Sequence, residues 1–171
     1  MGTVTLSRII AGIAFRAEAL SDAGPAVIDK LAETARLAEL GTGTAASKAD
    51  KIFLDARTLA ASANEDPDLA GALTDPFGVA VVFAKVKAIL IRAAAGNTNS
   101  VVVKPAAATG FLGPFGAATH TITIPPGGAM LLAAPVGGWA VAAGSADLIN
   151  IANSGAGTGV TYTITVLGTS A

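Results

Sequence analysis

Apolar and polar residues alternate along most of the chain beyond residue 50, and this alternation predicts β-strands. The clearest example is residues 82–92 (VFAKVKAILIR), where Lys85 and Lys87 stand two apart with Val86 between them. Residues two apart share one face of a strand, so the pattern predicts a strand that has one face at least partly exposed to water.

Further short strands are predicted between turns that are rich in glycine, proline and asparagine. They are residues 101–103, 119–124, 129–134, 139–141, 147–152 and 160–167. No convincing helical pattern interrupts them, which disfavours a fold of alternating strands and helices. We therefore expect residues 51–171 to form an all-β domain, a jelly-roll-like β-sandwich.

The first fifty residues give a different signal. Residues 6–20 and 26–40 are rich in alanine, leucine, glutamate and arginine, a composition that favours helix. In the second segment, Val27, Leu31, Ala35 and Ala38 fall at helical spacing, but the apolar residues as a whole fit neither the helical nor the strand period cleanly. Residues 1–50 are therefore treated as an N-terminal arm or extension, for which a helical and an extended structure both stay open.

Charge is distributed unevenly along the chain. Of the 171 residues, 52% are apolar and only 13% are charged, with a formal net charge of -1. All eleven lysines and arginines lie at or before Lys104, and Asp147 is the only charged residue from 105 to 171. Free soluble domains usually carry charge on roughly a quarter to a third of their surface positions. The neutral C-terminal third suits a surface that other subunits cover. The alternative is a sandwich of small residues from a source whose proteins carry little charge.

The composition also argues against several classes of function. The absence of cysteine excludes a disulfide scaffold and a cysteine nucleophile, and the single histidine, His120, excludes a site built from several histidines. The near-neutral charge argues against a general nucleic-acid binder. The uncharged residues 127–146 are long enough to cross a membrane, but Pro135 and two glycine pairs interrupt them. We expect no enzymatic activity, no cofactor, no metal site, no nucleic-acid partner and no membrane contact.

An acidic segment is the one place where the sequence suggests an ion. Residues 64–68 (NEDPD) contain Asp66 and Asp68, whose oxygens are of the kind that calcium prefers. The segment lacks the spacing and the central glycine of an EF-hand loop. A solvated acidic loop is the simpler interpretation.

The candidate interface residues are basic or aromatic. Lys85, Lys87 and Arg92 lie in a stretch without any acidic residue, so they could meet an acidic partner surface or serve only as solubilising charges. Trp139 is the only tryptophan, and it could anchor an interface or pack into the core.

Several segments together resemble small virion proteins of tailed bacteriophages. They are residues 57–62 (RTLAAS), 65–71 (EDPDLAG), 73–78 (LTDPFG), 126–132 (PGGAMLL), 138–148 (GWAVAAGSADL) and 162–168 (YTITVLG). The resemblance implies a jelly-roll-like subunit of the virion, assembled in the host cytoplasm, and specifically a capsid decoration (cement) protein that reinforces the head. Its implied partners are its own copies, most simply in a homotrimer, and the major capsid protein or another virion protein.

Two other functions stay open at this point. A tail, baseplate or fibre component would share the fold and the low charge. A host-surface or carbohydrate-binding β-sandwich would use Trp139 and Tyr162 as flat platforms for sugar rings, although such sites usually expose more aromatic side chains than this chain contains.

Overall fold

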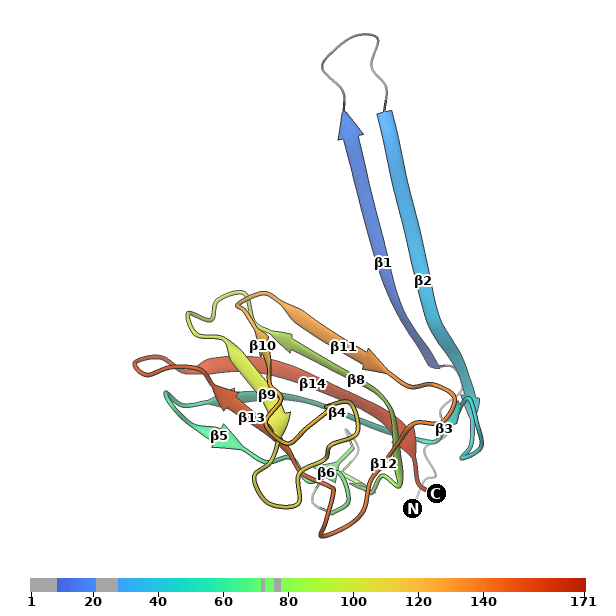
Figure 1. Cartoon of the computed structure of the whole chain (residues 1–171), viewed down its shortest axis with the longest axis vertical. Coiled ribbons are helices and arrows are strands. Elements are labelled where there is room, and N and C mark those ends of the chain that lie inside the picture. Colours follow the sequence, from blue (N-terminus) through green and yellow to red (C-terminus); the bar gives the residue numbers. More distant parts are fainter. Residues whose placement is uncertain (1–8, 21–27, 72, 76–77) are drawn as a thin grey trace.

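The computed structural model describes residues 9–20, 28–71, 73–75 and 78–171, and every regular element in these ranges is a β-strand (Figure 1). The all-β prediction for the sandwich is therefore confirmed. An arm at the N-terminus consists of β1 (Ile9–Leu20) and β2 (Ile28–Thr42), and the short β3 (Lys48–Ala49) pairs with the end of β2. The sandwich begins at β4.

Two antiparallel sheets form the sandwich. The large sheet contains, in spatial order, β4 (Lys51–Leu59), β14 (Val160–Thr169), β8 (Lys85–Ala93) and β11 (Ala129–Ala133), with β12 (Trp139–Ala140) also paired to β8. The small sheet contains β5 (Asn64–Glu65), β13 (Ile149–Asn153), β9 (Val101–Pro105) and β10 (Ile122–Ile124). Two strands of two residues each, β6 (Leu73–Thr74) and β7 (Ala80–Val81), pair with each other outside both sheets. The two four-strand orders are those of a jelly roll, as predicted.

The core lies between the two sheets. Tyr162, Ile164 and Val166 of β14 are completely buried, on the one side of the strand where the alternation predicts them. They belong to one apolar cluster with Ile149 and Ile151 of β13 in the small sheet. Burying a large aliphatic or aromatic side chain contributes about 1.5–3 kcal/mol, so this cluster holds the two sheets together.

A β-bulge in β8 changes which of its residues face the core. Leu167 of β14 pairs with Ala88, but the next residue, Gly168, pairs with Val86, so Lys87 is an extra residue in β8. An extra residue reverses the alternation of faces along a strand. The prediction of a water-exposed face is therefore correct for Lys85, which is exposed, and wrong for Lys87, which is only 2% exposed.

The arm is a long antiparallel hairpin that projects away from one end of the sandwich (Figure 1). Of the two alternatives that the sequence leaves open for residues 1–50, the extended one is found in β1 and β2, while residues 1–8 and 21–27 lie outside the described residues. The arm meets the sandwich through its base, where Leu40 (3% exposed) and Ala49 form a small buried cluster against which Leu167 of β14 packs. The Asp50 amide donates a hydrogen bond to the Gly168 carbonyl at 3.1 Å, which fixes the chain where the arm ends.

Residues 127–146, the uncharged run, contain β11 and β12 instead of a helix. Within the described ranges, no helix combines the length and the apolar character needed to cross a membrane.

Candidate functional site

The large sheet presents one face to the small sheet and a second face, which we call the outer face, away from it. The registers of β4, β8, β11 and β14 place on it Ile52, Leu54, Ala56, Thr58, Ala88, Leu90, Arg92, Ala129, Leu131, Ala133, Thr161, Thr163, Thr165 and Leu167. All of these residues except Arg92 are apolar or threonine. The solvated face of an antiparallel sheet normally carries mainly polar residues. Because the outer face departs from this pattern, it is the candidate interaction surface of this fold.

Exposure varies across the outer face. Leu54 on the edge strand β4 is 49% exposed, and it pairs across the sheet with Thr165. By contrast, Ala88 is only 4% exposed, and Leu167 packs against the buried cluster of Leu40 and Ala49 at the arm base. One end of the outer face is therefore covered within the chain. The exposed residues of this face are Leu54, Ala56, Thr58, Arg92, Ala129, Thr161 and Thr163.

The open end of the outer face carries its single charge. Arg92 is exposed there and borders a shallow hollow of about 290 Å³. Thr161, Thr163 and Gly127 are among the residues that line this hollow. A guanidinium beside two threonine hydroxyls is suited to accept a carboxylate from a partner.

The four candidate interface residues do not form one patch. Lys85 pairs with Ala140, next to Trp139 of β12, whereas Arg92 lies near the opposite end of β8. Trp139 is half-buried and packs against the core. Of the four, Arg92 is the one that the structure places on the outer face.

Lys87 has a structural environment of its own. Its Nζ donates a hydrogen bond to the Val136 carbonyl oxygen at 2.6 Å. The same carbonyl accepts a bond from the Ser47 amide at 3.4 Å, next to the arm base. Burial, helped by the charge of Lys85, lowers the pKa of Lys87 below its ordinary value. Lys87 therefore holds the loop that contains Val136 against β8, and its buried side chain cannot contact the surface of a partner.

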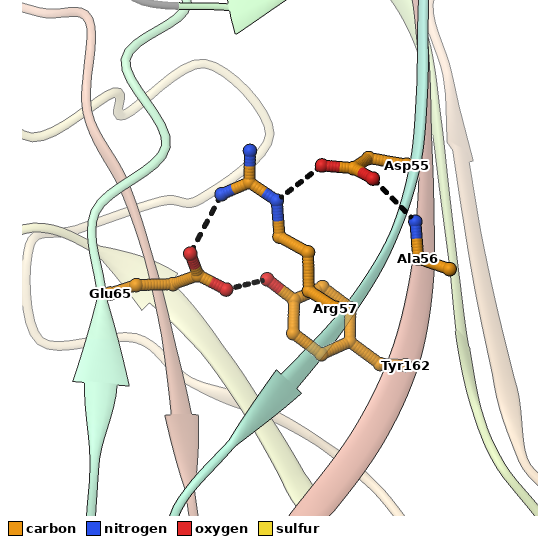
Figure 2. Close-up of polar contacts among 5 residues, drawn as sticks. All are labelled: Asp55, Ala56, Arg57, Glu65 and Tyr162. Atoms are coloured by element: carbon orange, nitrogen blue, oxygen red, sulfur yellow. Dashed lines mark hydrogen bonds and ion pairs between the residues drawn. The ribbon is translucent and has the colours of Figure 1, made fainter. Parts of the chain in front are cut away.

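A polar cluster that was not predicted from the sequence joins the two sheets at their edge (Figure 2). The Tyr162 hydroxyl donates to Glu65 Oε1 at 2.5 Å, and Arg57 Nη1 donates to Glu65 Oε2 at 2.7 Å. Arg57 Nε also donates to Asp55 Oδ2 at 2.9 Å. Burial, together with the bond to Glu65, raises the pKa of Tyr162 far above its ordinary value.

The cluster works as a clasp between edge strands. Asp55 and Arg57 lie on the inward side of β4, and Glu65 lies on β5 at the matching edge of the small sheet. Charged residues that point inward from an edge strand discourage that edge from pairing with another chain. Tyr162 is completely buried in this clasp, so its suggested role as a sugar platform is wrong.

The acidic segment is engaged in ordinary hydrogen bonds. Asp66 Oδ1 accepts a bond from the Asn150 side-chain amide at 2.6 Å, and Asp68 Oδ1 accepts one from the Ala70 amide at 2.8 Å. Across the part of the chain that the structure describes, no three histidine, cysteine, aspartate or glutamate residues are grouped to hold a metal ion.

Local sequence patterns miss these features because the partners are distant along the chain. Glu65 and Tyr162 are 97 residues apart, and nothing in either neighbourhood indicates the other. A weak signal exists for the clasp: Asp55 and Arg57 interrupt the inward, apolar side of a strand pattern. The outer face also leaves a signal, since Leu90 is apolar although its neighbours Ile89 and Ile91 occupy the core side.

No protein-family model and no curated protein matches the chain. A chain from a solved structure of Bacillus endospore appendages, described as a novel family of disulfide-linked pili, shows a weak structural likeness. It is 13% identical, and the comparison covers 75% of the present chain and 96% of the other, with a TM-score of 0.36. A likeness at that level carries no argument about function.

Proposed function

We propose that the protein is a non-enzymatic structural subunit that assembles with its own copies on the particle of a tailed bacteriophage, as a capsid decoration protein that reinforces the head. The observation that carries the proposal is the outer face, a partly exposed surface of apolar and threonine residues whose only charge is Arg92. Contiguous apolar surface that a soluble chain leaves uncovered marks an interaction site.

The physical basis is the burial of low-charge surface between subunits. Removing apolar surface from water yields about 25 cal/mol per Å², and contacts that stay assembled are more apolar than transient ones. A trimer around one axis is one closed arrangement in which every subunit makes the same contacts. The assignment to a phage head rests on the resemblance of residues 57–62, 65–71 and 162–168, because a jelly roll by itself serves many functions.

The test has two measurements. Light scattering at micromolar concentration should give a mass that is a multiple of the subunit mass, and a stable monomer would contradict self-assembly. Immunogold labelling of particles purified from cultures that produce the protein should then place the label over the faces of the head.

The labelling also decides between the proposed head location and the alternative. Label at one vertex or along the tail would replace the decoration role by a tail, baseplate or fibre role. An absence of label on every particle, in preparations where the protein is detected in the cell, would overturn the virion assignment itself.

A further inference from the structure

We propose that Lys104 and Asn150 join their side chains in an amide bond inside the folded chain, with Asp66 as the group that transfers the proton. The inference goes beyond the proposed function, because it concerns chemistry within one subunit and does not depend on assembly. It rests on the row that these three residues form across the small sheet.

The three residues lie side by side on neighbouring strands. Lys104 of β9 pairs directly with Asn150 of β13. On the other side of β13, Ile151 pairs with Glu65 of β5, and the same antiparallel register places Asp66 opposite Asn150. The strands β9, β13 and β5 are neighbours in this sheet (Figure 1). Opposed residues of an antiparallel pair share one face of the sheet, so the three side chains form one row.

The row lies on the face of the small sheet that points away from the core. Ile149 and Ile151, on either side of Asn150 in the chain, belong to the buried core between the sheets, and so does Val103 next to Lys104. Asn150 is nevertheless only 5% exposed, whereas Lys104 is half-buried. The row therefore combines an amide that is shielded from water with an amine on a flexible stem.

The side-chain amide of Asn150 is held at its nitrogen and open at its oxygen. Its Nδ2 donates a hydrogen bond to Asp66 Oδ1 at 2.6 Å. Its Oδ1 is buried and has no hydrogen-bond partner among the described residues. A buried acceptor without a partner loses its hydration for nothing in return, so such an atom in a folded protein needs an explanation. An amide that is about to react at its carbonyl group provides one.

Lys104 carries the amine that can reach this carbonyl group. Opposed residues on antiparallel strands have Cβ atoms about 5 Å apart, and the four-carbon stem of lysine is flexible enough to bring Nζ back to Asn150 Cγ. Within the described ranges, no ion pair or hydrogen bond holds the Lys104 amine elsewhere. Lys104 is also the only basic residue that follows Arg92 in the chain.

The reaction is an exchange of one amide for another. The neutral Lys104 amine attacks Asn150 Cγ, so a bond forms from Nζ to Cγ and the carbonyl electron pair moves to Oδ1. Asp66 accepts the proton that Nζ loses and passes it to Nδ2. The bond from Cγ to Nδ2 then breaks, Nδ2 leaves as ammonia, and the electron pair on Oδ1 restores the carbonyl group. No oxidant, reductant or water is consumed.

Position and proton transfer together make this exchange feasible in a folded chain. Holding an amine and an amide at opposed positions turns a reaction between two molecules into one within a single molecule. Asp66 already bonds the nitrogen atom that has to leave, so it is in place as the acid for that step. The product would tie β9 to β13 and close a loop between residues 104 and 150, which restricts the unfolded chain and stabilises the sandwich.

The first measurement is the mass of the intact, full-length protein. The folded wild-type protein should be lighter than its sequence by one molecule of ammonia. A protein that is folded, as judged by the fluorescence of Trp139, and has the full mass of its sequence would overturn the inference.

The second measurement locates the loss, because an asparagine that closes a ring onto its own backbone also releases ammonia. Chymotrypsin cleaves after Phe111 and Trp139, which lie between the two residues. The cross-link should therefore appear as a branched peptide that joins the segment of Lys104 to the segment of Asn150. A loss confined to a single linear peptide would contradict the proposed bond.

Two lysine variants test the nucleophile. Lys104→Arg keeps the positive charge but replaces the amine by a guanidinium, which does not lose its proton in proteins. It should retain the full mass of its own sequence. Lys85→Arg, at an exposed position of β8, is the matched control and should still lose ammonia. A branched peptide that persists in Lys104→Arg would show that another residue supplies the amine.

Aspartate variants test the proton transfer. The cross-link is followed by mass in protein freshly made in a cell-free extract, so that its rate of formation can be measured. Asp66→Asn should slow it by about a hundredfold or more, and Asp66→Glu, which restores a carboxylate, should recover part of the rate. Asp68→Asn is the matched control, because Asp68 accepts a hydrogen bond from the Ala70 amide. Equal rates in Asp66→Asn and Asp68→Asn would overturn the role of Asp66.

Discussion

The inner and outer faces of the large sheet are made by the same strands, yet only one of them is closed within the chain. On β14, Tyr162, Ile164 and Val166 are completely buried against the small sheet, while Thr163 between them is exposed. The inner face has a cover in the small sheet, and the outer face has one only near the arm base. The comparison separates the surface that stabilises the folded chain from the surface that the proposed self-assembly would cover.

Stability should therefore depend on the inner face far more than on the outer one. Ile164→Ala should lower the free energy of unfolding by about 3 kcal/mol, because it removes buried methyl groups and leaves a cavity between the sheets. Thr163→Ala, one residue away on the outer face, should change it by less than about 0.5 kcal/mol. Urea unfolding followed by Trp139 fluorescence measures both values, and similar losses for the two variants would contradict the division.

In the bulge of β8, the positions that face the core and those that face outward change over. We expect this site to be the next most sensitive to substitution. A Cβ atom at Gly168 would lie 2.2 Å from the Lys85 carbonyl oxygen and 2.6 Å from the Phe83 ring, in the middle of the bulge. Gly168→Ala should therefore cost about 2 kcal/mol.

The control for this substitution is Gly96→Ala. A Cβ atom there would meet no atom within 4 Å, and the variant should leave stability nearly unchanged. If Gly168→Ala unfolds at the same urea concentration as Gly96→Ala, the close approach in the bulge does not constrain the sheet.

These two sites show why the sequence predicts one face better than the other. The alternation in residues 160–167 identifies the inner face of β14 correctly, because that strand is regular on both sides of Ile164. In β8 the same reasoning fails at Lys87, because a bulge depends on the pairing partner Gly168, which is distant along the chain.

The sequence left the structure of the arm open between helix and extended chain and gave no prediction of the clasp, for related reasons. Local composition favours helix in residues 6–20 and 26–40, yet residues 9–20 and 28–40 pair with each other as strands, so a long-range partner overrides propensity. The clasp joins Arg57, Glu65 and Tyr162 across two sheets, and no local period contains it. The jelly roll was predictable since turns and alternation are local, whereas the contacts between its edges are not.

The clasp allows a test of the inner face through pH. Tyr162 is the only tyrosine, and its pKa is raised in the folded state. Above about pH 10 the unfolded chain loses the phenolic proton and the folded chain keeps it, so stability falls by up to about 1.4 kcal/mol per pH unit. Tyr162→Phe should remove this alkaline slope.

The same titration can be followed directly by the absorbance of the phenolate. In the native protein it should appear only together with unfolding, and after urea denaturation it should appear near pH 10. A phenolate that forms near pH 10 in a chain that is still folded would show that Tyr162 is not sealed between the sheets.

Lys87 gives the smallest expected effect and tests the covered end of the outer face. At neutral pH its buried ammonium has one hydrogen bond, to the Val136 carbonyl, and burial lowers its pKa. Lys87→Met keeps an unbranched side chain that is one atom shorter and removes the charge, so it should raise the free energy of unfolding by about 1 kcal/mol at pH 7.

The gain from Lys87→Met should shrink as the pH rises toward 10. In the wild-type protein the folded chain releases the Lys87 proton before the unfolded chain does, so the unfolded state binds more protons and wild-type stability rises with pH in that interval. Lys85→Met, at an exposed position of the same strand, should have almost no effect at either pH. A loss of stability in Lys87→Met that does not change with pH would contradict this prediction. It would mean that the hydrogen bond to Val136 outweighs the cost of burying the charge, so that this bond, more than apolar contact, stabilises this end of the outer face.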